Sequence, residues 1–261
     1  TRDRLLRLVL PFTVAALSVI PIAYYAIALR QQPDLGFTQF WWKTVTVGPW
    51  PSGPVWFVWV LFVLDFTGAV LFRTVPQIID PLSRLALRGF AEPLRFFCVF
   101  AAITLIAYVP LRLYFGPNTW FEFGPLSVQA SRVLLYAAYF FVGAGIGAAG
   151  LSRGLLSPEG RLATGHWWGW AILALIPYAL LWGLIVIKRG PLGNPDMLPV
   201  WYEATYGVLF ALFSVAITFT ILAVFLRFMR DGRSILDPLQ HDAYGIFLVH
   251  YAFVLWLQYW L

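Results

Sequence analysis

Long apolar runs separated by polar or Pro/Gly-rich segments dominate the chain. A helix needs roughly 20 residues to cross a hydrocarbon core of about 30 Å, and seven runs have about that length. Apolar and polar residues do not alternate as they do in membrane β-strands, so each run predicts a helix. The predicted spans are 8–29, 54–72, 94–115, 133–151, 167–187, 206–226 and 243–261. The pattern predicts an all-α, polytopic membrane bundle with seven transmembrane helices in this chain.

Composition agrees with a membrane protein and excludes several other classes. Hydrophobic residues make up 61% of the chain and charged residues only 11%, whereas soluble domains carry about 25% charge. Disorder, a coiled coil and a nucleic-acid-binding module are therefore excluded. Twelve Lys and Arg residues lie on the Thr1 side of the predicted spans and six on the other. Positive charge marks the cytoplasmic side, so we expect a multi-pass protein of the inner (plasma) membrane with Thr1 in the cytoplasm.

Ionisable side chains inside a bilayer are costly, which makes each one a functional candidate. Asp65 is the only acidic residue within a predicted span, and His250 is the only histidine. At 1.5 Å per residue, Asp65 lies about 16 Å from the outer end of its span and His250 about 10 Å from the cytoplasmic end of its own. We expect them to interact at similar depth. Each is either a buried polar residue satisfied by a neighbouring helix or part of a catalytic site.

A glycine motif in the fourth span matches a dinucleotide-binding pattern letter for letter. Gly145, Gly147 and Gly150 have the G-x-G-x-x-G spacing, but that motif requires a preceding strand and a following helix. Inside a membrane helix, small residues instead allow close helix packing. We expect the packing faces to be Gly143 with Gly147, and Ala144 with Ala148.

The chain starts with a basic segment and offers no metal site. Arg4 and Arg7 lie three residues apart, on one face of a helix. Two readings remain open, an anchor to lipid headgroups or a cradle for the phosphates of a cytosolic donor. No spacing of His, Cys, Asp or Glu suits a zinc ion. Cys98 is the single cysteine, so an internal disulfide is excluded.

Four segments, in order along the chain, resemble the membrane-bound acyltransferase-3 family. Residues 4–12 (RLLRLVLPF) resemble its arginine-rich entry into the third membrane helix, and residues 53–61 (GPVWFVWVL) resemble a Gly-Pro-Leu-Trp-Phe helix start. Residues 139–145 (YFFVGAG) are similar to its Phe-x-x-Gly helix, and residues 243–250 (AYGIFLVH) to its Ser-Tyr-Gly-Ile-Tyr-Leu-x-His motif. The resemblance implies one membrane-embedded domain over residues 1–261.

The chain also departs from that family. The family's catalytic histidine and the arginine before it lie in its first membrane helix, and neither has a counterpart here. Thr1 opens directly onto a basic helix start and Leu261 ends an apolar run. We therefore expect a domain incomplete at both ends, part of a ten-helix protein and inactive by itself. The resemblance leaves the catalytic residues unknown, with His250 and Asp65 as weak candidates.

The resemblance implies transfer of an acyl group from cytosolic acyl-CoA to a hydroxyl of an extracytoplasmic glycan or lipid, such as O-acetylation of a polysaccharide. Acyl-CoA would be the donor substrate, with no bound cofactor. The alternative is a transporter or flippase of a lipid-linked glycan that uses Asp65 and His250 as a proton relay. The substrate-binding residues would be Arg4 and Arg7 for the donor, with Trp56, Phe57, Trp59 and Tyr244. For the tryptophans, anchoring at the membrane interface remains open.

Overall fold

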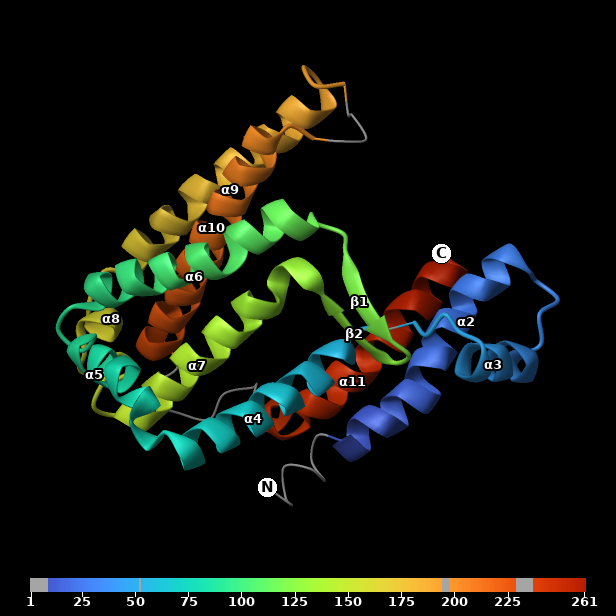
Figure 1. Cartoon of the computed structure of the whole chain (residues 1–261), viewed down its shortest axis with the longest axis horizontal. Helices are drawn as coiled ribbons and strands as arrows, with labels where there is room; N and C mark the ends of the chain where they lie inside the picture. Colours follow the sequence, from blue (N-terminus) through green and yellow to red (C-terminus); the bar gives the residue numbers. More distant parts are fainter. Residues whose placement is uncertain (1–8, 52, 194–197, 229–236) are drawn as a thin grey trace. The chain divides into compact units, whose positions relative to one another are not determined.

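A computed structural model describes residues 9–51, 53–193, 198–228 and 237–261. Within them, regular structure is helical apart from one β-hairpin (Figure 1). The elements are a π-helical turn at Ala15–Val19, α2 (Ile20–Gln31), α3 (Phe37–Thr46), α4 (Trp56–Thr74), a 3₁₀ turn at Pro76–Ile79, α5 (Asp80–Arg88), α6 (Pro93–Phe115), β1 (Trp120–Phe123), β2 (Leu126–Gln129), a 3₁₀ turn at Ala130–Arg132, α7 (Val133–Ala149), α8 (Arg161–Thr164), α9 (Trp167–Arg189), α10 (Val200–Phe228) and α11 (Asp237–Trp260). The predicted all-α class is confirmed.

The chain divides into two compact units, which we describe separately. Unit 1 comprises Thr1–Ala69, Trp120–Val128 and Arg233–Leu261, and unit 2 comprises Val70–Thr119 and Gln129–Gly232. Unit 1 thus contains α2, α3, most of α4, the hairpin and α11. Unit 2 contains α5 to α10.

Six helices among the described residues are long and apolar enough to cross a membrane. They are Val9–Gln31, Trp56–Thr74, Pro93–Phe115, Ala130–Ala149, Trp167–Arg189 and Val200–Phe228. Each overlaps one of the first six predicted spans. The predicted span 243–261 falls within α11, which is not among the six, and His250 and Gln258 lower the hydropathy of this segment. A seventh crossing therefore stays a prediction.

Several elements were not predicted from the apolar pattern. α10 begins at Val200, six residues before the predicted start, because aromatic and polar residues continue the helix beyond its apolar part. α3 and α5 are short helices in segments that we expected to be loops. They lie outside the long apolar runs, and such short amphipathic helices form by packing one face on a neighbour.

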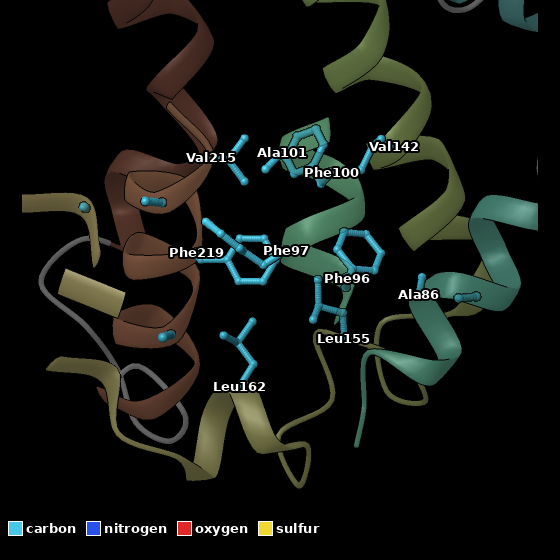
Figure 2. Close-up of a cluster of buried hydrophobic side chains, with 14 residues drawn as sticks. Ala86, Phe96, Phe97, Phe100, Ala101, Val142, Leu155, Leu162, Val215 and Phe219 are labelled. Carbon is cyan, nitrogen blue, oxygen red and sulfur yellow. The ribbon is translucent and has the colours of Figure 1, made fainter. Parts of the chain in front are cut away.

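The core of unit 2 is an aromatic cluster between α6, α7 and α10. Phe96, Phe97 and Phe100 extend from α6, and the Phe97 and Phe219 rings meet edge to face with centroids 5.4 Å apart. Figure 2 shows Leu155 and Leu162, from the segments after α7, lying against the same cluster. Burying each such side chain contributes about 1.5–3 kcal/mol, so these contacts hold the helices of unit 2 together.

The close-packing face of α7 differs from the predicted one. Gly143 and Gly147 are exposed, whereas Val142, Gly145 and Ala149 are buried. These three positions share a face because they are three and four residues apart. A Cβ on Gly145 would lie 2.5 Å from Leu82 Cβ of α5. A small residue of α7 does make a close contact with a neighbouring helix, as predicted. The predicted face of α7 was wrong, because the spacing of small residues alone does not show which face of a helix meets a neighbour.

Replacing Gly145 by Ala is expected to lower the free energy of unfolding by about 1–3 kcal/mol. The new methyl group would overlap Leu82 close to its backbone, where a rotamer change gives no relief. Gly147→Ala is the matched control, since its Cβ would meet nothing within 4 Å and alanine is the better helix former. Thermal unfolding of both variants in detergent measures the difference. Equal melting temperatures would contradict the observed packing.

In unit 1, α2 packs against the N-terminal helical turns, α4 and α11. Ile20 and Val58 are fully buried there and belong, with Leu248 of α11, to one buried cluster. Pro21 has no N–H to donate to the carbonyl of Leu17 four residues earlier. Trp41 Nε1 of α3 donates to that oxygen at 2.7 Å. The proline does not end the helix, and the carbonyl that it leaves without a donor provides a contact for α3.

Candidate functional site

The one acid and the one histidine of the predicted spans, Asp65 and His250, both lie in unit 1, on α4 and α11. His250 is half-buried, and its Nδ1 lies 2.7 Å from the carbonyl oxygen of Phe247. The rings of Phe57 and Phe247 touch, with centroids 6.1 Å apart, and the two helices run in opposite directions (Figure 1). Counting 1.5 Å per residue from that contact puts Asp65 and His250 about 16 Å apart along the helices.

The structure therefore does not bring Asp65 and His250 together. α11 begins at Asp237, six residues before the predicted start of the span. His250 is consequently further than expected from the start of its helix, the end that is predicted to be cytoplasmic. The similar depths estimated from sequence depended on that start.

We expect Asp65→Asn and His250→Gln to have additive effects. Sites more than about 7–10 Å apart usually add within 0.3–0.5 kcal/mol. A double-mutant cycle on the free energy of unfolding checks this. A coupling above about 1 kcal/mol would mean that the two side chains act as one unit.

The predicted aromatic substrate site lies at the start of α4, where its rings contact one another and the hairpin. Trp59 Nε1 donates to the carbonyl oxygen of Ser127 at 2.9 Å. The Trp56 ring meets those of Phe57 and Trp120 edge to face, with centroids 6.0 and 6.1 Å away. These contacts use part of the ring surfaces. Phe57 remains 43% exposed.

The remaining predicted binding residues are Tyr244, Arg4 and Arg7. Tyr244 lies on α11 and is exposed. Arg4 and Arg7 lie outside the described residues, so the predicted phosphate cradle stays a prediction.

Unit 2 has an open cleft on the face predicted to be cytoplasmic. Its volume is about 810 Å³, and Arg95, Arg161, Cys98 and Trp170 are among its lining residues. Arg95 pairs with Glu92 at 3.4 Å, and both side chains are more than half exposed, so this pair is weak. The cleft presents two guanidinium groups to solvent beside an aromatic wall.

The opposite end of unit 2 contains a buried ion pair between α6 and α10. Arg112 Nη2 lies 2.5 Å from Glu203 Oε2, and the side chains are only 7% and 16% exposed. Arg112 also donates to the Tyr108 hydroxyl at 3.1 Å and stacks on the Tyr206 ring, 4.3 Å from its centroid. A Cβ on Gly207 would come within 3.2 Å of Arg112 Cδ. The glycine thus leaves the space that the guanidinium stem occupies.

Unit 1 contains a hollow of about 500 Å³ between α2, α3 and the turn that follows α3. Half-buried rings of Tyr24, Phe40 and Trp50 line it, together with polar side chains at its rim. The predicted orientation puts this hollow on the extracytoplasmic side, since α2 runs outward from the cytoplasm. Its volume falls within the range of small-molecule sites.

Comparison with known families decides what kind of protein carries these features. A family model described as an acyltransferase domain, that of the acyltransferase-3 family, matches residues 1–261, the whole chain. The chain belongs to the acyltransferase-3 family. No curated protein and no solved structure matches it. Family membership and the six membrane-spanning helices make this acyltransferase-3 protein a multi-pass membrane acyltransferase.

Sequence reasoning missed the buried ion pair of this acyltransferase-3 chain. Arg112 was counted only among the six basic residues on the side away from Thr1, and Glu203 was placed before its span because the predicted start of 206 was too late. Glu203 lies inside α10, so Asp65 is not the only acid within a span. The signal was present in the spacing of Tyr202, Tyr206 and Phe210, which lie four residues apart and continue the helix upstream.

The hollow between α2 and α3 was missed for a different reason. Its lining comes from α2, α3 and the following turn, and α3 was expected to be a loop. Gln39 and Lys43 have no pattern in sequence that separates them from ordinary solvent-exposed residues. α3 itself places these two residues on one face, and its packing on α2 adds the Tyr24 ring and Gln31 to the same hollow.

Proposed function

We propose that this acyltransferase moves an acyl group from cytosolic acyl-CoA to a hydroxyl group of an extracytoplasmic glycan or lipid at the inner (plasma) membrane. The observation that carries the proposal is the family match over the whole chain, combined with membrane-spanning helices. A surface polysaccharide that accepts an acetyl group is the first acceptor to test.

Binding of the donor is the role that we assign to the basic residues on the cytoplasmic side. Arg4 and Arg7 occur three residues apart, and guanidinium groups bind phosphate oxygens through paired charge-assisted hydrogen bonds. The cleft of unit 2 supports a cytosolic anionic substrate as well, because it presents Arg95 and Arg161. We assign no catalytic role to the cleft.

The chemical step would be the attack of the acceptor hydroxyl on the thioester. The hydroxyl oxygen forms a bond to the acyl carbon, the carbon–sulfur bond breaks, and the sulfur leaves as the thiol of coenzyme A after taking up the hydroxyl proton. A general base that carries this proton typically contributes 10²–10⁴ in rate, and donors aimed at the developing oxyanion contribute further. His250 and Asp65 are the two candidates for proton transfer in this chain.

Turnover measured in nanodiscs tests the proposal. The full-length protein is mixed with radiolabelled acetyl-CoA and purified surface polysaccharide, and the expected result is equal amounts of labelled polysaccharide and free coenzyme A. Empty nanodiscs are the control. No label on any glycan or lipid acceptor would contradict the proposal. If acetyl-CoA remained intact while a fluorescent lipid-linked glycan crossed proteoliposome membranes, the transporter alternative would replace it.

A further inference from the structure

We propose that the hollow between α2 and α3 binds one sugar ring of the acceptor, and that Lys43 at its rim pairs with an acidic group on that sugar. This inference rests on the proposed function for the presence of an extracytoplasmic acceptor. It goes further by assigning the acceptor a binding site and a chemical class, a pyranose that carries a carboxylate or phosphate.

The walls of the hollow have the surface chemistry that a sugar ring requires. Tyr24, Phe40 and Trp50 contribute aromatic rings, and the C–H face of a pyranose packs on such flat apolar surfaces. Sugars also present hydroxyl groups around the ring edge. Gln31, Gln32 and Gln39 line the same hollow, and each amide offers both donors and acceptors to hydroxyl groups. Apolar walls with a polar rim suit a carbohydrate better than a lipid chain.

The hollow is held in place before any ligand arrives. α3 is fixed to the N-terminal helical segment by Trp41 Nε1, which donates to Leu17 O at 2.7 Å. The Tyr25 hydroxyl donates to the carbonyl oxygen of Leu35, before α3, at 2.5 Å. Trp50 packs against the buried cluster that contains Ile20. A wall that is already ordered loses little conformational entropy on binding.

Charge at the hollow favours an acidic sugar. Among the described residues that line it, Lys43 is the only charged one and none is acidic. Among the described residues Lys43 makes no ion pair, and its side chain is exposed in the last turn of α3. An ammonium group is a flexible point charge that pairs with carboxylate or phosphate. The hollow therefore presents a net positive charge to its ligand.

Two probes that differ in a single group test the inference. Methyl β-D-glucuronide and methyl β-D-glucoside share the ring and differ only in a carboxylate against a hydroxymethyl group. Saturation-transfer NMR on the full-length protein in nanodiscs is expected to show that both probes bind, with the strongest saturation transfer at the ring C–H protons. Trp50→Leu should weaken both signals at least about fivefold, since loss of a contact of about 1 kcal/mol corresponds to that factor. Lys43→Gln should weaken only the glucuronide.

Matched variants keep the outcome decisive. Trp42→Leu removes a tryptophan of α3 that is 63% exposed and does not line the hollow, so its signals should equal those of the wild type. Gln39→Leu leaves the core contacts of Trp50 intact and should weaken the binding of both probes. Signals equal to those of empty nanodiscs, or equal losses in the Trp42 and Trp50 variants, would overturn the inference. Acetyl-CoA turnover in the same samples separates this inference from the proposed function. Wild-type protein that binds the sugars and does not turn over acetyl-CoA would contradict only the proposed function.

Discussion

Replacing Arg112 by Leu is expected to destabilise the protein more than any other single substitution that we consider. Glu203 would remain 16% exposed without its counter-charge, and breaking a buried pair in this way costs about 3–5 kcal/mol. The Arg112 side chain also leaves the Tyr206 ring, which adds the loss of a cation–π contact. The measurement is the free energy of unfolding in a denaturant titration of the full-length protein in mixed micelles.

The double variant Arg112→Leu/Glu203→Leu is the informative control. Replacing both members of a buried pair by apolar residues is often nearly neutral, so most of the lost stability should return. Arg153→Leu, an exposed arginine outside the helices, should change stability by less than about 0.5 kcal/mol. A double variant as unstable as Arg112→Leu would show that the pair is not the main contact of Arg112.

Substituting Arg4 and Arg7 together by Gln is expected to raise the KM for acyl-CoA well beyond about tenfold, from the loss of charge-assisted hydrogen bonds on the order of 1–3 kcal/mol. The reason is their spacing on one helical face at the predicted cytoplasmic end of the first span. Initial rates of acetyl-CoA turnover, over a range of donor concentrations, give KM and kcat separately.

The matched control for this pair lies on α5. Arg84 and Arg88 are exposed, lie four residues apart and, like Arg4 and Arg7, fall on the predicted cytoplasmic side. Gln at both of those positions should leave the donor KM within about twofold. If both double variants gave the same KM at normal membrane levels, Arg4 and Arg7 would be lipid anchors.

The helices of this protein could be predicted from sequence because the bilayer imposes a length and an apolar composition on each span. The first six predicted spans overlap observed helices for that reason. Their ends were less predictable. α10 and α11 start six residues before the expected positions. In α10 the added turns contain Tyr202, which is buried, so packing on a neighbour extends this helix beyond its apolar run.

The candidate site was harder to predict because it depends on tertiary contacts. Arg112 and Glu203 are 91 positions apart along the chain and meet only when α6 packs on α10. Asp65 and His250 share an apolar setting in sequence, yet the contact of Phe57 with Phe247 sets the two helices in a register that separates them. Residue type and depth identified the ionisable groups, and helix register decided which of them meet.

The most direct test of the account is transfer across the membrane. Inside-out vesicles that contain the full-length protein expose its cytoplasmic face, and radiolabelled acetyl-CoA is added only to the external medium. The account predicts free coenzyme A outside and label on acceptor hydroxyl groups in the lumen, protected from an added esterase until detergent opens the vesicles. Label that the esterase removes from intact vesicles, or acetyl-CoA that stays intact while the acceptor crosses the membrane, would contradict it.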